Sequence, residues 1–200
     1  MLRRVLLVVP LAMILLIPVV PRQATAAETK VIDTENVYGG KTILTTYSTA
    51  DQEYKLTKKL EYQDGNGVKR KVEGFRANNQ YNELKIEKAT ELYSEKGILQ
   101  SVEVLISDEK ARVLGYYKVI TSYNPEGLKT REEIYYNKSD FQEKIYSKSI
   151  DYFREGEKYK SEYYLAPQES KRTGYYKLIT IYKKGKMVDQ QFYDKEGRQL

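Results

Sequence analysis

Apolar and polar residues alternate along most of the chain with a period of two, and clusters of Gly, Pro, Asn and Asp interrupt this alternation at regular intervals. One stretch, Gly115–Tyr123, recurs as Gly174–Tyr182 at an offset of 59 residues, and a fainter copy, Tyr146–Phe153, lies halfway between them. Period-two alternation rich in β-branched and aromatic residues is typical of β-strands, and the offsets indicate a unit of about 30 residues. The pattern therefore predicts tandem β-hairpins.

Five copies of this hairpin fill residues 54–200 when the chain is aligned on that period. The first strand of each copy has a lysine at one fixed position and an apolar or aromatic residue two positions before it. The second strand has Glu or Gln at a fixed position, followed two positions later by an aromatic residue or Leu. In chain order the columns are Lys58, Lys88, Lys118, Lys148 and Lys177; Leu56, Ile86, Tyr116, Tyr146 and Tyr175; Glu73, Glu103, Glu133, Glu162 and Gln191; and Phe75, Leu105, Tyr135, Tyr164 and Tyr193.

The turn residues predict how the two strands of each hairpin face each other. Asn124-Pro125-Glu126-Gly127 has the Pro and Gly that a type I turn favours, so we take Pro125-Glu126 as a two-residue loop. Arg154-Glu155-Gly156 is taken as a three-residue loop. Both loops place each lysine opposite the acid or amide of its own hairpin. The resulting pairs include Lys118–Glu133, Lys148–Glu162, Tyr116–Tyr135, Tyr146–Tyr164 and Tyr175–Tyr193.

The N-terminal part of the repeat region diverges from the five copies. Val31–Tyr38 and Lys41–Tyr47 flank Gly39-Gly40, which predicts an atypical hairpin that caps the repeats over residues 27–53. Counting it gives about twelve strands, and no segment after residue 26 has a helical period. We predict an all-β fold with a single domain over residues 27–200. Its strands form an antiparallel meander, either an elongated single sheet or an open half-barrel.

Several residues of the third copy resemble a known type of repeat. They are Gly115, Lys118, Tyr123, Gly127-Leu128-Lys129, Glu133 and Tyr136-Asn137. The pattern is similar to the tandem hairpin units of bacterial MORN-like proteins, including antitoxin-type repeats, over about residues 54–200. The period here is longer, and most copies lack the glycine usual at the second turn. The resemblance implies an elongated sheet used for binding or scaffolding, and it carries over no catalytic residue.

Residues 1–26 have the layout of a secretory signal peptide. Arg3 and Arg4 precede an apolar run, Val5–Val20, that contains two prolines, and Ala24-Thr25-Ala26 supplies small residues for a signal peptidase. Sixteen residues with two prolines are short for a membrane span. We therefore expect cleavage before Ala27, a periplasmic or secreted protein, and no transmembrane segment in the mature chain.

The composition excludes several function classes. The chain has 20 Tyr but no Cys, no His and no Trp, so it lacks a disulfide framework, the commonest metal ligand and the usual partners of a catalytic nucleophile. Residues 1–26 hold three Arg and no acid, so the net charge of +6 becomes +3 without them. That balance is too mild to predict nucleic-acid binding. We expect no cofactor and no enzymatic activity.

The lysine and tyrosine columns are the candidate binding surface. Its residues are Tyr116, Tyr135, Tyr146, Tyr164, Tyr175, Tyr193, Lys118, Lys148 and Lys177. The alternative interpretation is purely structural: lysine–glutamate and tyrosine–tyrosine pairs of this kind also stabilise antiparallel sheets without any ligand. Because three Tyr–Tyr pairs follow one another in the last three copies, any binding site is expected between residues 116 and 193.

The expected function is that of an exported, non-catalytic binding or scaffold module whose partner is a protein or glycan of the cell envelope. Two alternatives stay open. A periplasmic carrier would hold a lipid or lipoprotein acyl chain in a half-barrel, but charged columns on the sheet count against this role. A glycan hydrolase needs only two suitably spaced carboxylates. Here the acids recur once per repeat, whereas a catalytic pair is normally unique.

Overall fold

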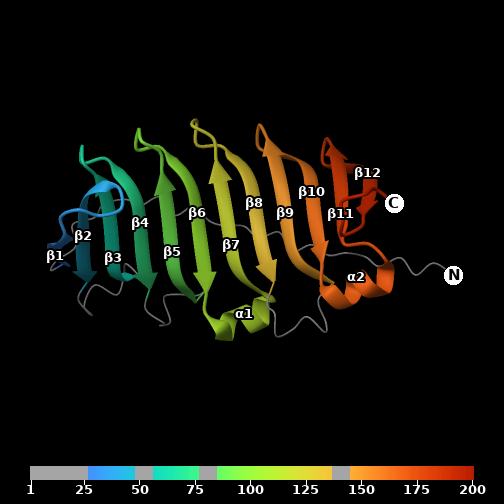
Figure 1. The fold of residues 1–200 in the computed structure, drawn as a ribbon, viewed down its shortest axis with the longest axis horizontal. Coiled ribbons are helices and arrows are strands. Elements are labelled where there is room, and N and C mark those ends of the chain that lie inside the picture. The colour runs from blue at the N-terminus through green and yellow to red at the C-terminus, as the bar shows by residue number, and fades with distance from the viewer. Residues whose placement is uncertain (1–26, 48–55, 77–84, 137–144) are drawn as a thin grey trace.

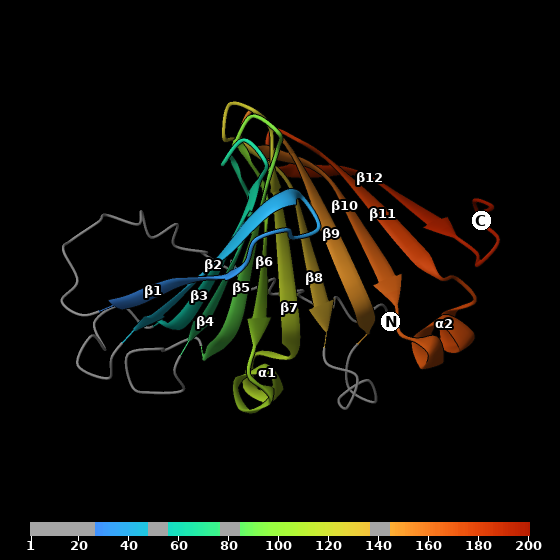
Figure 2. The ribbon, with the colours of Figure 1, turned by 60° about the vertical axis from the view of Figure 1, so that its left-hand side comes forward.

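The computed structural model describes residues 27–47, 56–76, 85–136 and 145–200. Twelve strands form one open antiparallel sheet in which each strand pairs with its neighbours in the chain, from β1 at one edge to β12 at the other (Figure 1). The predicted all-β meander is therefore confirmed. Figure 2 shows that the sheet is strongly twisted rather than flat. The predicted signal peptide, residues 1–26, lies outside the described residues.

The strands are seven to nine residues long. They are β1 (Ala27–Asp33), β2 (Gly39–Tyr47), β3 (Leu56–Asp64), β4 (Lys69–Arg76), β5 (Ile86–Tyr93), β6 (Leu99–Ile106), β7 (Tyr116–Tyr123), β8 (Lys129–Tyr136), β9 (Tyr146–Arg154), β10 (Glu157–Leu165), β11 (Lys177–Lys183) and β12 (Lys186–Tyr193). The five predicted hairpins are β3–β4, β5–β6, β7–β8, β9–β10 and β11–β12. Their turns all lie at the same end of the strands (Figure 1).

The predicted register within the hairpins is wrong by two residues. Lys118 faces Tyr135, and Glu133 faces Ile120 instead of Lys118. In the next hairpin Lys148 faces Tyr164. The shift preserves the face on which each side chain lies, because two residues are one full period of a strand. Lysines and glutamates therefore share a face, but they do not stand opposite each other.

Turn geometry causes half of this shift. The β7–β8 loop has three residues, because the amide of Asn124 donates to the carbonyl of Leu128 and the amide of Gly127 donates to Asn124. Gly127 has a φ of +80°, the left-handed conformation that closes this type of turn. The β9–β10 loop has two residues, Glu155 and Gly156, both with positive φ, as in a type I′ turn.

A β-bulge near each turn causes the other half. In every hairpin one residue of the second strand has no partner across the ladder, so the register moves by one position. The extra residues are Arg70, Gln100, Thr130, Tyr159 and Val188. They recur at the spacing of the repeat, so the bulge belongs to the repeated unit.

Two short helices interrupt the meander, contrary to the prediction that none would occur. α1 (Asp108–Leu114) follows β6, and α2 (Pro167–Thr173) follows β10. Each spans about two turns, which is too short to show a helical period. The sequence does contain their end signals: Ser107 caps α1, Pro167 starts α2, and left-handed Gly115 and Gly174 end them. Both glycines begin the stretch that repeats at 59 residues, so this larger repeat is two hairpins with a helix.

The N-terminal hairpin β1–β2 turns at residues 34–38 rather than at the predicted Gly39-Gly40. Asn36 is buried and fixes this turn: its side-chain amide donates to the carbonyl of Gln63 in β3 at 3.0 Å, and its Oδ1 accepts from the amide of Tyr38 at 2.8 Å. Gly40 lies so close to β3 that a Cβ there would overlap the backbone of Asp64. The turn is therefore held tightly against the first repeat.

The apolar core of the described residues is thin. Fully or nearly fully buried aliphatic side chains are spread along the sheet at Ile106, Val119, Ile150, Leu165 and Leu178. Within the described ranges the only other elements are the two helices, which lie at the end of the strands opposite the hairpin turns (Figure 1). Much of the burial must therefore come from neighbouring side chains on the same face, and long Tyr and Lys side chains supply it.

Candidate functional site

One row of side chains crosses the sheet from β3 to β12 and alternates lysine with an aromatic residue or Leu. Its members pair strand by strand without a break: Lys58, Phe75, Lys88, Leu105, Lys118, Tyr135, Lys148, Tyr164, Lys177 and Tyr193. We call this the lysine–aromatic row and its side of the sheet the lysine face. Six of the nine predicted site residues lie in it, which brings Lys118, Lys148 and Lys177 next to Tyr135, Tyr164 and Tyr193.

The lysines of this row lie over the neighbouring rings. The ammonium nitrogen of Lys118 is 4.2 Å from the centre of the Tyr135 ring, Lys148 is 4.7 Å from Tyr164, and Lys177 is 4.8 Å from that of Tyr193. At such distances the negative face of an aromatic ring attracts a cation. Each lysine is thus placed by the ring of its ladder partner, not by the glutamate that the predicted register put opposite it.

A second row on the same face carries the glutamates. It contains Leu60, Glu73, Thr90, Glu103, Ile120, Glu133, Ile150, Glu162, Ile179 and Gln191. Glu133 accepts from the Tyr135 hydroxyl at 2.9 Å and pairs with Arg131 at 3.1 Å and Lys148 at 3.8 Å. Glu73, Glu133 and Glu162 are buried by the longer side chains around them, so these three glutamates lie at the base of the lysine face.

The same arrangement recurs in two other copies. Glu162 accepts from the Tyr164 hydroxyl and from Lys160, both at 2.9 Å. Glu73 accepts from Tyr62 at 2.9 Å, from Lys71 at 3.0 Å and from Lys88 at 2.5 Å. In each copy, the cation two residues before the glutamate on the same strand is one of its partners. We call this repeated set of contacts the Tyr–Glu–Lys lattice.

The pKa values of several members of the lattice are shifted, among them those of Glu73, Glu162 and Tyr135. Burial alone would raise the pKa of the Glu73 carboxyl, but hydrogen bonds from Lys88, Lys71 and Tyr62 outweigh it and lower that pKa to about 2. The pKa of Glu162 is lowered in the same way, with burial outweighed by Lys160 and Tyr164. Burial and the hydrogen bond to Glu133 raise the pKa of Tyr135 to about 12. At neutral pH Glu73 and Glu162 are therefore ionised, and Tyr135 is a neutral donor.

The other three predicted site residues, Tyr116, Tyr146 and Tyr175, lie on the opposite face. The Tyr146 ring is 4.9 Å from that of Tyr163, and the Tyr175 ring is 4.9 Å from that of Phe192; both partners belong to the opposite face. Tyr116 faces Tyr136. The predicted pairs Tyr116–Tyr135, Tyr146–Tyr164 and Tyr175–Tyr193 therefore do not form.

A further bulge causes this reversal. Tyr117 has no ladder partner between Tyr116 and Lys118, and Ser147 occupies the same position in β9, so the residue before each bulge turns to the other side of the sheet. Tyr117 and Tyr176 supply rings to the lysine face instead, with centres 6.3 Å from Tyr135 and 5.9 Å from Tyr164. The doublets Tyr116-Tyr117 and Tyr175-Tyr176 were the only signal of this exchange in the sequence.

The opposite face is more apolar along its middle. Its central row contains Lys59, Gly74, Ala89, Val104, Val119, Ile134, Ser149, Tyr163, Leu178 and Phe192. The next row towards the turns carries acids, among them Glu91, Glu132 and Asp151. Val119, Tyr163 and Leu178 are already buried by their neighbours. This face therefore offers neither an uncharged surface nor a row of exposed aliphatic side chains.

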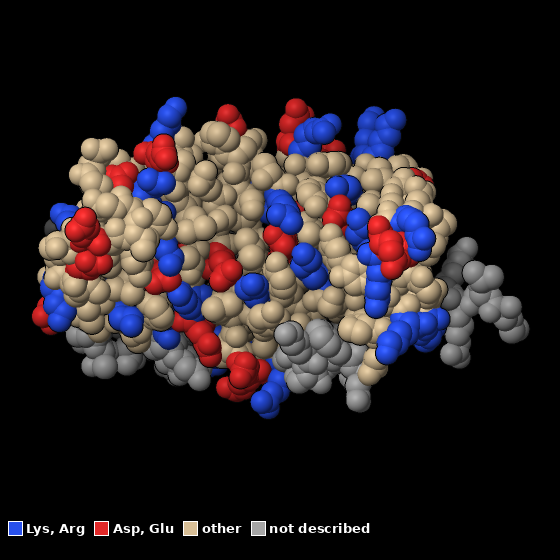
Figure 3. Space-filling model, viewed as in Figure 1, with Lys and Arg blue, Asp and Glu red and all other residues tan. Residues whose placement is uncertain are grey.

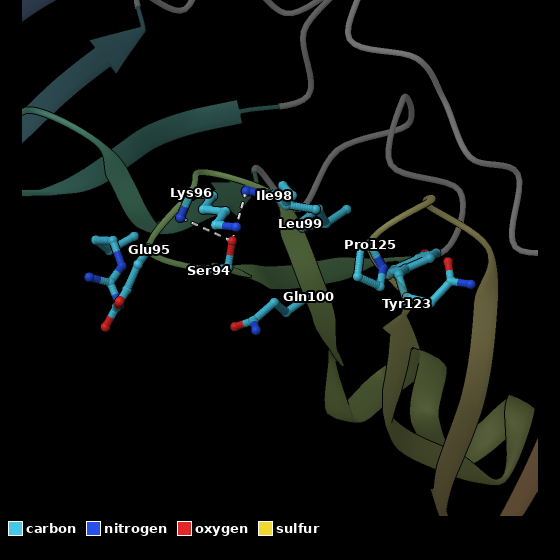
Figure 4. Close-up of a pocket in the computed structure, with 10 residues that line it drawn as sticks. Ser94, Glu95, Lys96, Ile98, Leu99, Gln100, Tyr123 and Pro125 are labelled. Atoms are coloured by element: carbon cyan, nitrogen blue, oxygen red, sulfur yellow. Dashed lines mark hydrogen bonds between the residues drawn. The ribbon is translucent and has the colours of Figure 1, made fainter.

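On the side of the molecule that Figure 3 shows, basic and acidic side chains are interleaved instead of forming patches of one sign. A hollow of about 560 Å³ lies between the turns of β5–β6 and β7–β8 (Figure 4). Ser94 shapes it by accepting from the amides of Lys96 and Ile98, and Tyr123 and Pro125 form the other wall. None of the predicted site residues lines it.

Neither a known family model nor a curated protein matches this chain. The resemblance to MORN-like repeats therefore stays a prediction. Within the described ranges, no helix is both long enough and apolar enough to span a membrane.

Proposed function

We propose that this protein is an exported, non-catalytic binding or scaffold module that uses the lysine face to hold an extended partner of the cell envelope, a glycan or a protein. The observation that carries the proposal is the lysine–aromatic row, which runs through all five repeats on one face of an open sheet. A structural ladder needs cross-strand pairs, but it does not need the same cation in every repeat.

The row suits a linear partner with a regular repeat. Neighbouring strands lie about 4.8 Å apart, so lysines on alternate strands recur about every 10 Å along the row. Between them, half-buried rings such as Tyr135 and Tyr164 present apolar surface with a polar edge. Because Glu73, Glu133 and Glu162 in the neighbouring row are buried, the groups that a partner meets first at those repeats are ammonium ions and rings. That chemistry favours a polymer with anionic or hydroxyl-rich units.

The state of the carboxylates favours a non-catalytic role. A glycoside hydrolase requires one carboxylic acid with a raised pKa to protonate the leaving group. The lowered pKa values of Glu73 and Glu162 keep these groups ionised, and ion pairs occupy their oxygens. These contacts favour a structural role for Glu73 and Glu162 in the sheet.

Replacing Lys118, Lys148 and Lys177 together by Gln is expected to weaken binding of the mature protein to purified cell-envelope glycans or envelope proteins by tenfold or more. Removing three ammonium groups from one row removes most of its attraction for an anionic partner, and the remaining binding should depend less on salt. The measurement is co-sedimentation or surface binding over a range of ionic strength, with glycan and protein fractions tested separately.

The matched control replaces Lys183, Lys184 and Lys186 by Gln, because these lysines surround the β11–β12 turn and lie outside the row. It makes the same change in net charge and should alter binding less than twofold. Equal losses in the two variants would mean that only total charge matters, and the row would then have no special role.

Export is tested separately. N-terminal sequencing of the protein from its natural host is expected to show a chain that starts at Ala27 or Glu28 in the periplasmic or secreted fraction. The reason is the short, proline-broken apolar run followed by Ala-Thr-Ala. Recovery of a chain that retains Met1 in the membrane fraction would contradict it.

A further inference from the structure

The Tyr–Glu–Lys lattice is interrupted in the second repeat. The position two residues before the glutamate holds Lys71, Arg131 or Lys160 in three copies, but Ser101 in the second. The position two residues after it holds a tyrosine, Tyr135 or Tyr164, in the third and fourth copies, but Leu105 here. Glu103 thus keeps its place in the glutamate row while both side chains that would hold it on its own strand are absent.

The contacts of Glu103 show the consequence. Its one ion pair among the described residues is with Lys118 on the next strand, at 3.8 Å. Glu133 has the same contact with Lys148, also at 3.8 Å, and adds Arg131 and Tyr135. The Glu103 side chain is 37% exposed, whereas that of Glu133 is 11% exposed. Glu103 is therefore an ionisable group placed like the others but left open to a further partner.

A hollow of about 330 Å³ lies beside Ser101 and Glu103, where the missing cation would be. Its floor belongs to two adjacent rows of the lysine face, and one wall comes from the β1–β2 turn. The lining residues are Tyr38, Lys71, Thr90, Leu92, Ser101, Glu103 and Ile120. The volume is at the small end of the range for ligand sites in proteins.

The walls of the hollow are fixed before any ligand enters. Tyr38 follows the turn that Asn36 anchors to β3, and the Arg70 guanidinium lies 5.4 Å from the centre of its ring. Lys71 is held by Glu73 at 3.0 Å, a carboxylate that it shares with Lys88. Leu92 is 40% exposed and offers apolar surface. The site therefore combines one under-paired carboxylate with an aromatic wall and an aliphatic floor.

We infer that this hollow binds a primary amine or guanidinium that carries an apolar group. The cation takes the place that Arg131 has beside Glu133 and pairs with Glu103, within reach of the Ser101 hydroxyl. The apolar group lies over Leu92 and Ile120 against Tyr38. The ligand is either a free amine or a Lys or Arg side chain of a partner protein, since both present the same chemistry.

Tyramine, which joins an aromatic ring to a primary amine, is the first probe. We expect calorimetric titration of the mature protein to show one site for tyramine and at least tenfold weaker binding of tyrosol, its neutral alcohol counterpart. N-acetyl-lysine amide is titrated in parallel: binding of this capped residue identifies a protein side chain as an acceptable source, and binding of tyramine alone identifies a free amine. Failure of both amines to bind, or equal binding of tyramine and tyrosol, overturns the inference.

Two variants assign the site. Glu103→Gln should weaken tyramine binding at least tenfold, while Glu133→Gln, at the equivalent position of the complete lattice, should change it less than twofold. Ser101→Lys restores the missing cation, so it should abolish binding and raise the melting temperature, a result that misfolding cannot imitate. Unchanged affinity in Glu103→Gln or Ser101→Lys overturns the inference. The site lies outside the lysine–aromatic row, so its failure is distinguishable from that of the proposed function.

Discussion

Ile150→Ala is expected to lower the free energy of unfolding by about 2–5 kcal/mol, the range for truncation of a fully buried aliphatic side chain. Ile150 is 2% exposed and lies between Glu133 and Glu162 in the glutamate row. Its loss leaves a cavity and also opens the two neighbouring carboxylates to water. In so thin a core, few other apolar side chains are available to fill the space.

Urea unfolding followed by circular dichroism measures this effect. Ile145→Ala is the matched control, because it removes the same atoms from a side chain that is 42% exposed. We expect the control to cost less than about 1 kcal/mol. If the two variants lost the same stability, Ile150 would not belong to a packed core.

Acid is expected to destabilise the protein through the Tyr–Glu–Lys lattice. The folded-state pKa of Glu73, about 2, is below the ordinary value of 4.5, so this carboxylate stabilises the fold above pH 4.5. That contribution is lost as the pH falls from about 4.5 towards 2. The full shift would correspond to about 3 kcal/mol, but solvent screening on an open face reduces this to on the order of 1–2 kcal/mol.

Glu73→Gln tests this origin. The variant should be less stable than the natural protein at pH 7, and the difference should shrink as the pH falls towards 2, because Glu73 becomes protonated over that range. Glu103→Gln is the control on the same row, since Glu103 has a single ion pair among the described residues and should matter little for folding. A stability difference for Glu73→Gln that did not change between pH 7 and pH 2 would show that charge on Glu73 is not the cause.

The fold class follows from the sequence because its evidence is repeated five times. The lysine at Lys58 and its four equivalents lies on a strand in every copy, so errors in one copy do not affect the reading of the others. The face of the sheet on which Lys118 and Glu133 lie was also predicted correctly, because a shift of two residues along a strand leaves a side chain on the same face. An antiparallel meander of about twelve strands follows from these patterns alone, whereas the choice between an elongated sheet and an open half-barrel does not.

Register was not predictable, because a bulge has no clear mark in the sequence. Thr130 and Tyr159 are ordinary strand residues, yet each shifts its ladder by one position. One loop was predicted one residue too short and the other one residue too long, and both errors moved the register by one position in the same direction. Agreement between copies of a repeat therefore tests consistency, and it does not test the register that all copies share.

The candidate site shows the same limit. Half of the predicted tyrosines belong to the lysine face and half to the other, since the bulge at Tyr117 and its equivalents turns the preceding residue over. The gap in the second repeat was visible as Ser101 and Leu105 in their columns. Its meaning depends on the hydrogen bonds that hold Glu133 and Glu162, and only the structure reveals these.

The strand order has a consequence for how the chain folds. Every strand pairs with the next one along the chain, so no contact within the sheet waits for a distant segment to arrive. The entropy needed to close each loop is small, and contact order is low for an all-β protein. Each hairpin can dock onto the preceding one as soon as its own two strands have formed. Unfolding should begin by fraying of the edge strands, β1 or β12. The sheet would then grow by one strand at a time, in the order in which the strands occur along the chain.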